Sequence, residues 1–118
     1  MIRKGRLGSP FSGEHMLSPA KTGNGDWIIV EGLASLVIHF ALASATDNDI
    51  TFTVEAVATV KKNEMTSPKL LTTIAGSSRD TNNANSYAIT DNAWAAVRVN
   101  CTKYAAGGAG SKAIMSGR

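Results

Sequence analysis

Apolar and polar residues alternate most regularly between residues 50 and 60. One set of positions holds only apolar side chains: Ile50, Phe52, Val54, Ala56, Ala58 and Val60. The other set is mostly polar: Thr51, Thr53, Glu55, Val57 and Thr59. A period of two predicts a β-strand with one face in a core. A helix fits poorly, because β-branched side chains crowd it and no apolar stripe of period 3.6 emerges.

Weaker versions of this alternation flank residues 50–60. In residues 33–43 the even positions from Leu36 to Leu42 are large and apolar, which predicts an inward face. A short buried strand is expected at residues 27–30, ending in a turn at residues 31–32. Further strands are expected at residues 70–74, 86–90, 94–102 and 112–116, with polar turns at 47–49 and 91–92. Residues 76–85 are expected to form an exposed, mobile loop without regular structure. The pattern predicts an all-β fold, a small antiparallel β-sandwich or jelly-roll-like domain.

Residues 1–25 differ from the rest of the chain in their density of glycine and proline. These residues break regular structure, so we expect an extended arm over 1–25 that precedes a sandwich domain over 26–118. Two interpretations stay open: a disordered tail, or an arm ordered by a neighbouring subunit. Apolar side chains that the arm could bury there are Ile2, Leu7, Phe11, Met16 and Leu17.

The formal net charge of +3 comes entirely from this arm. The arm carries the basic residues Arg3, Lys4, Arg6 and Lys21 against Glu14, and the remaining basic and acidic residues balance. So few positive charges disfavour nucleic acid as the partner, because specific binding uses a larger basic footprint. Charged residues make up only 18% of the chain, against about a quarter in average proteins, so part of the surface is expected to contact other protein.

Residue types that carry chemistry are few and scattered. Cys101 is the only cysteine, which excludes an intrachain disulfide, suits a reducing cytoplasm, and is in phase with the apolar Val97 and Val99. His39 is predicted to face outward, and a metal site with His15 would require the arm to fold back onto the sheet. We therefore expect no enzyme, no cofactor and no metal. No apolar segment is long enough to predict a membrane span or a signal peptide.

The polar turn and the two tryptophans leave alternatives. Asp47 and Asp49 are read as turn residues, because a calcium site needs more oxygen ligands than this segment offers. Trp27 and Trp94 each begin a predicted strand and are expected to close the ends of the core. An exposed pair could instead form a sugar-stacking platform, with the Asn-rich loop 76–85 beside it.

Three segments together resemble a known class of proteins. Trp27-Ile28-Ile29-Val30-Glu31-Gly32 after a Gly-rich arm, the strand Thr51–Glu55, and the strand Trp94–Asn100 before a Gly-rich end are similar to small β-sandwich virion proteins of tailed bacteriophages. The resemblance covers residues 23–115 and rests on the pattern of strands and Gly-rich segments, not on catalytic motifs. It implies a non-enzymatic capsid decoration (cement) subunit that is assembled in the host cytoplasm and binds the major capsid protein. A tail, neck or fibre component is the close alternative.

This reading gives the chain other virion proteins and copies of itself as partners. A carbohydrate-binding module is the alternative of another class. The residues expected to bind partners lie mainly in the arm: Arg3, Lys4, Arg6, Leu7, Phe11, Met16, Leu17, Trp27 and Trp94.

Overall fold

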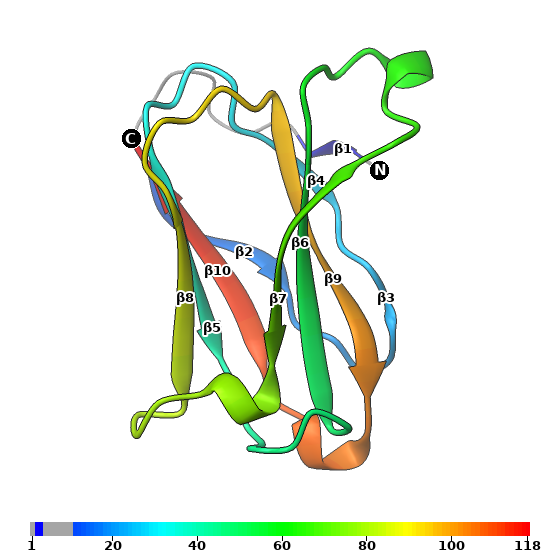
Figure 1. Ribbon diagram of the computed structural model, residues 1–118, viewed down its shortest axis with the longest axis vertical. Coiled ribbons are helices and arrows are strands. Elements are labelled where there is room, and N and C mark those ends of the chain that lie inside the picture. The colour runs from blue at the N-terminus through cyan, green and yellow to red at the C-terminus, as the bar shows by residue number, and fades with distance from the viewer. Residues whose placement is uncertain (1, 4–10) are drawn as a thin grey trace.

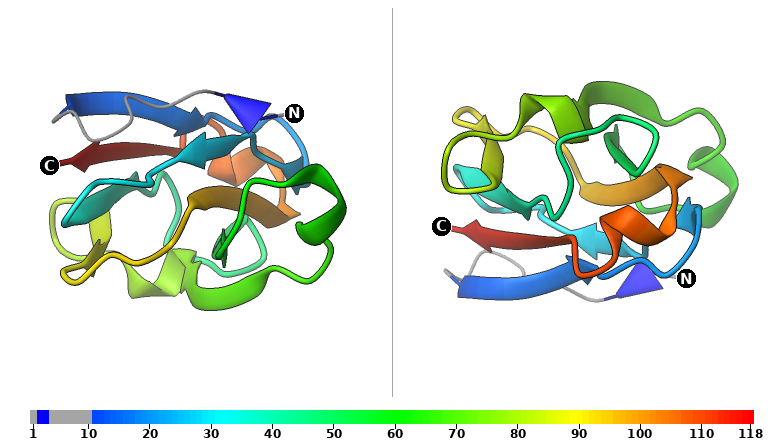
Figure 2. Two further views of the ribbon diagram at one scale, coloured as in Figure 1. Left: turned by 90° about the horizontal axis from the view of Figure 1, so that it is seen from above. Right: turned by 90° about the horizontal axis from the view of Figure 1, so that it is seen from below.

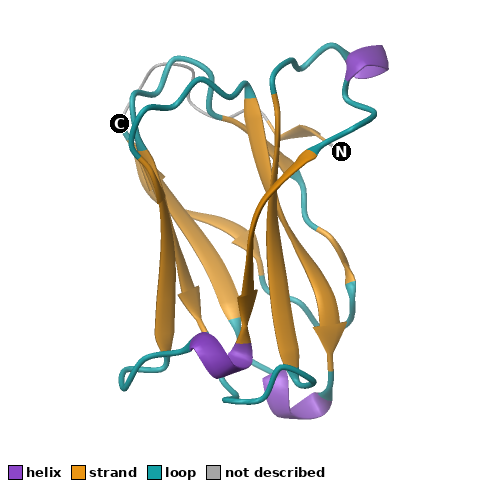
Figure 3. Ribbon diagram, viewed as in Figure 1, coloured by secondary structure: helices purple, strands orange, loops and turns teal. Residues whose placement is uncertain are grey.

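The computed structural model describes residues 2–3 and 11–118; side chains are described from Gly13, except those of residues 14, 15 and 62. The fold is all-β, as the alternation predicted. Two sheets pack face to face, and the only helical segments in the described residues are three short 3₁₀ turns (Figures 1 and 3). These turns are η1 (Lys62–Glu64), η2 (Gly76–Ser78) and η3 (Ala106–Gly108).

Sheet B has four strands, all antiparallel. In spatial order they are β2 (Phe11–Leu17), β10 (Lys112–Gly117), β5 (Leu36–Ala41) and β8 (Ala84–Ile89). The β5–β8 register runs without interruption from Leu36–Ile89 to Ala41–Ala84. Because β8 pairs only with β5, it forms one free edge of the molecule (Figure 1).

Sheet A has six strands. Along its main path the order is β1 (Ile2–Arg3), β4 (Trp27–Ile29), β9 (Ala96–Tyr104), β6 (Ile50–Val57) and β7 (Lys69–Ala75), and β3 (Gly23–Asn24) also pairs with β9. All these pairs are antiparallel except the short β1–β4 pair. Viewed from the two ends in Figure 2, the sheets lie beside one another as two layers.

The connections between strands define the fold more closely. From β4 onward, every connection crosses between the sheets except the β6–β7 hairpin. Four strands of sheet B (β2, β10, β5, β8) therefore interleave in sequence with four of sheet A (β4, β9, β6, β7). Eight antiparallel strands wound in this order form a jelly roll.

The core lies between the sheets, where the alternating residues point inward. Ile50, Phe52, Val54 and Ala56 are fully buried, as predicted, and the even residues of β5 face them. The rings of Phe40 and Phe52 meet across the two sheets with centroids 5.4 Å apart, within the range of favourable aromatic contacts. β6 ends at Val57, earlier than predicted, and Ala58, which was expected to face the core, is exposed.

The prediction that residues 1–25 lack regular structure is wrong for residues 11–17. They form β2, which pairs with β10 at the edge of sheet B. Gly13 has a φ of 74°, a conformation that glycine adopts readily, and its N–H donates to Ser116 Oγ at 3.1 Å. The pairing of β2 with β10 contains two register shifts. Glycine here shapes an irregular strand instead of ending one.

Gly25 was expected only to break regular structure, but the structure gives it a packing role. A Cβ at this position would collide with the backbone oxygen of Val99 in β9. The Gly25 N–H donates to that same oxygen at 2.9 Å. Gly25 therefore permits close approach of the chain to sheet A, so the segment before residue 26 packs on the sandwich domain.

Residues 76–85 also contain more structure than predicted. They begin with η2, make a turn between Asp80 and Asn83, and already enter β8 at Ala84. Asn83 has a φ of 61°, which asparagine tolerates better than most residues. Most of this segment is exposed, as predicted, and backbone and side-chain hydrogen bonds form its turn.

Candidate binding surfaces

The outer face of sheet B is a regular surface formed by three neighbouring strands. The residues on it are Val37, His39 and Ala41 of β5, Ala84, Ser86 and Ala88 of β8, and Lys112, Ile114 and Ser116 of β10; we call this set the sheet-B face. Opposite positions in the registers place these residues in rows across three strands, for example Ser86–His39–Ile114. The inward neighbours Ala113 and Met115 are fully buried, which confirms that Ile114 points outward.

The sheet-B face carries mostly small side chains and little charge. Most of its side chains are small, and Lys112 is its one formal charge. Val37 is 39% exposed although it is apolar, and His39 is exposed as predicted. Such a face loses little hydration of charged groups when another protein covers it.

The outer face of sheet A is occupied by its own side chains. Trp27, Val57 and Ala96 form a small buried cluster there, against which Val60 and Met65 of the following loop pack. The Arg98 guanidinium carbon lies 4.5 Å from the centroid of the Trp27 ring, a cation–π contact. Together with Glu55 and Asn100 these residues make up what we call the sheet-A cluster: Trp27, Glu55, Val57, Ala96, Arg98 and Asn100.

Glu55 is the polar centre of the sheet-A cluster. Its Oε1 accepts from Arg98 Nε at 2.9 Å and lies 2.8 Å from Arg98 Nη2. Asn100 Nδ2 donates to the same oxygen at 2.5 Å. The Asn100 side-chain oxygen is buried without a hydrogen-bond partner. Opposite charges at outward positions of two predicted strands are the sequence signal that could have revealed this pair.

Trp27 and Trp94 do not form an exposed pair. Trp27 is only 7% exposed and is covered by Arg98, whereas Trp94 is half-buried and packs against the main core. Trp94 packs against the main core, as predicted, but it lies two residues before β9 begins. Trp27 begins β4, as predicted, but it belongs to the sheet-A cluster and not to the main core. The stacking platform that a sugar ring would need is absent from these two residues.

The predicted partner-binding residues of the arm separate into two groups. Met16 is 5% exposed and belongs to the main core, and Leu17 packs against that core, so both bury their apolar surface within the chain. The side chains of the others lie outside the described residues: Arg3, Lys4, Arg6, Leu7 and Phe11. For that second group, partner binding stays a prediction.

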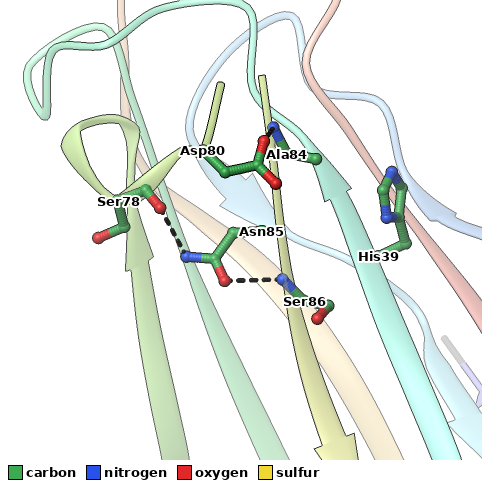
Figure 4. A pocket seen from close by; sticks show the side chains of 6 residues that line it. All are labelled: His39, Ser78, Asp80, Ala84, Asn85 and Ser86. Atoms are coloured by element: carbon green, nitrogen blue, oxygen red, sulfur yellow. Dashed lines mark hydrogen bonds between the residues drawn. The ribbon is translucent and has the colours of Figure 1, made fainter. Parts of the chain in front are cut away.

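A shallow pocket of about 250 Å³ opens beside β8 and is shown in Figure 4. The residues that line it are His39, Ser78, Asp80, Ala84, Asn85 and Ser86. The chain itself already engages much of this polar lining. Asp80 Oδ1 accepts from the backbone N–H groups of Asn82 and Ala84, and Asn85 bridges Ser78 and Ser86. These contacts organise the turn before β8.

The Asp47–Asp49 turn holds its carboxylates by hydrogen bonds, as expected of turn residues. Hydrogen bonds from the side chain and backbone of Ser77 lower the pKa of Asp47, whose Oδ1 lies 2.9 Å from Ser77 N. Hydrogen bonds from the Ser44 and Thr46 hydroxyls lower the pKa of Asp49, with Ser44 Oγ at 2.6 Å. The turn thereby ties the β5–β6 connection to η2.

The reactive residue types lie apart from one another. Cys101 is 2% exposed, and burial raises the pKa of its thiol, in agreement with its predicted place in the core. The arm does return to the sheet, because the backbone of His15 pairs with Ile114, which pairs with His39 on its other side. Within the described residues, no three His, Cys, Asp or Glu side chains gather in a way that could hold a metal ion.

The described residues also contain no helix of the length and hydropathy needed to cross a membrane.

Comparison of the chain with protein-family models, with curated proteins and with solved structures found no match.

Proposed function

We propose that this protein is a non-enzymatic structural subunit of a virion, a capsid decoration subunit that binds neighbouring capsid proteins and stabilises the particle. The observation that carries the proposal is the sheet-B face, a regular and weakly charged surface on which Val37, His39, Ser86 and Ala88 are exposed. The jelly roll supports the proposal as an analogy, because capsid proteins use this fold, although lectins and other proteins use it as well. The low charge content of 18% points in the same direction.

The size of the sheet-B face fits a subunit that works in many copies. Three strands about 4.8 Å apart and about 20 Å long cover roughly 290 Å². A stable pairwise interface buries about 800 Å² on each partner, so one such contact alone is weak. On a particle, a first contact raises the effective concentration for the next, and weak contacts become sufficient.

Localisation on purified particles tests the proposal directly. Particles from the source culture are banded on a density gradient, and the chain is detected by mass spectrometry and by immunogold labelling. Label over the capsid surface is expected. Label on the tail, neck or fibres would select that alternative, and absence of the chain from the particles would contradict both.

Two substitutions then test the face. Val37→Asp places a charge on the sheet-B face, and Leu70→Asp is its matched control, because Leu70 is an apolar residue 52% exposed on sheet A. Particles that lack the chain are mixed with each purified variant, and bound protein and survival on heating are measured. We expect Val37→Asp to lose binding and protection while Leu70→Asp retains both; equal binding by the two would contradict a role for the face.

The carbohydrate-binding alternative receives less support from the geometry. It relied on Trp27 and Trp94 as a platform and on residues 76–85, and the Trp27 ring is covered. A glycan array with the purified chain separates the two classes. A hit abolished by Trp94→Ala, with no association with particles, would favour the lectin.

A further inference from the structure

The β8 edge of sheet B is a site at which another strand could add. An edge strand presents unpaired backbone N–H and C=O groups, and proteins block such edges with charges, prolines or bulges. β8 has the sequence Ala-Asn-Ser-Tyr-Ala-Ile, which contains no charge and no proline, and its register with β5 has no bulge. By these criteria β8 is an unprotected edge.

The hydrogen bonds show which backbone groups of β8 point away from the sheet. Leu42 N–H donates to Asn83 C=O at 2.8 Å, which continues the β5–β8 ladder by one pair. Because antiparallel pairs alternate between bonded and non-bonded, the backbone groups of residues 85, 87 and 89 face β5. Those of residues 84, 86 and 88 therefore face outward.

Asp80 and Asn85 engage three of these six outward groups. Asp80 engages both groups of Ala84: its Oδ1 accepts from Ala84 N–H at 3.0 Å, and its own N–H donates to Ala84 C=O at 2.8 Å. Asn85 Oδ1 accepts from Ser86 N–H at 2.7 Å, while Asn85 Nδ2 donates to Ser78 C=O at 3.0 Å (Figure 4). Among the described residues, no bond is found for Ser86 C=O or for the two backbone groups of Ala88.

We propose that Asp80 and Asn85 close the β8 edge and thereby prevent sheet B from pairing edge to edge with a second copy of the chain. The open remainder offers only three backbone groups, too few for a stable ladder. This role is independent of the proposed virion function, and it leaves the sheet-B face, not the β8 edge, as the surface for assembly.

Removing both caps is the first test. In Asp80→Ala/Asn85→Ala the N–H groups of Ala84 and Ser86 become available, while Ala84 C=O keeps its bond from the backbone N–H of residue 80. Two extra hydrogen bonds are expected to lower the concentration of half-maximal self-association by about tenfold. Size-exclusion chromatography with light scattering measures it. The control Asn82→Ala/Asp91→Ala removes the same side-chain types from exposed positions and is expected to behave as wild type. Unchanged association of a folded double variant would overturn the proposal.

A third substitution identifies the surface that associates. Ala88→Pro removes an outward N–H, so it breaks no bond to β5, and proline is tolerated at such edge positions. Added to the double variant, it is expected to reverse the self-association. Persistent association would mean that the β8 edge is not the contact and would contradict the proposal.

Amide hydrogen exchange tests the caps in the unaltered protein, whatever the stability of the variants. The N–H groups of Ala84 and Ser86 are expected to exchange more slowly than that of Ala88, although all three point outward. Equal exchange rates would show that the caps do not hold and would overturn the proposal.

Discussion

The two sheets of this jelly roll present outer faces of opposite character. On sheet A, Trp27 lies under Arg98, and Glu55 accepts hydrogen bonds from both Arg98 and Asn100, so this face is already packed by its own side chains. On the sheet-B face, small side chains surround the exposed Val37 and His39, and the described chain places nothing over them. The sheet-A cluster therefore contributes to stability, whereas the sheet-B face is the surface on which the proposed assembly depends.

Trp27→Ala is expected to have the largest effect on stability. The ring is 7% exposed, and truncation of a buried large aromatic costs about 3 to 4 kcal/mol through lost burial and the cavity that remains. Urea unfolding followed by circular dichroism measures the change. A loss below about 1 kcal/mol would show that the sheet-A cluster is only a surface contact.

Glu55→Ala is expected to cost about 2 kcal/mol. The change leaves Arg98 and Asn100 Nδ2 without their shared acceptor, and a charge that loses its buried partner is destabilising. This loss is smaller than the roughly 3 to 5 kcal/mol expected for a fully buried ion pair. The Glu55 and Arg98 side chains are 21% and 19% exposed, so water replaces part of the interaction. Glu64→Ala, at an exposed position, is the control and should change the unfolding midpoint little.

Acid is expected to weaken the Asp47–Asp49 turn. Both pKa values are lowered in the folded protein, so the stabilisation is present above the ordinary carboxyl pKa of about 3.9 and is lost as the pH falls through the folded values. The double variant Asp47→Asn/Asp49→Asn should lose less stability than wild type between about pH 5 and 2. An identical pH profile of the urea midpoint in the two proteins would contradict this assignment.

Val37→Ser is expected to have the smallest effect. Val37 is already 39% exposed, and surface substitutions of this kind change the free energy of unfolding by about 0.5 kcal/mol or less. Thermal and urea midpoints should therefore match those of wild type. A large loss of stability would mean that the sheet-B face is packed by the chain's own residues, and the contrast between the faces would disappear.

The inward face of the sandwich could be predicted because strand burial has a period of two. The alternation from Ile50 to Ala56 identified a buried set that the structure confirms, and the phase of Val97, Val99 and Cys101 did the same for β9. The outward position of His39 also followed from its phase. Each of these inferences needs only local sequence.

The candidate site was much less predictable. The expected binding residue Met16 is in the core, and the sheet-B face was not expected as a set, because its rows join β5, β8 and β10, which lie far apart in sequence. Asp80 and Asn85 looked like loop residues, since their role depends on which backbone groups of β8 point outward.

By itself, the sequence determined that the chain forms short strands with one apolar side each, and that these strands must stack to bury it. Only the tertiary structure decided that residues 11–17 join sheet B, that Arg98 covers Trp27, and which outer face remains open. The physical reason is that burial periodicity is local, whereas strand pairing and side-chain contacts join residues whose partners no local pattern specifies.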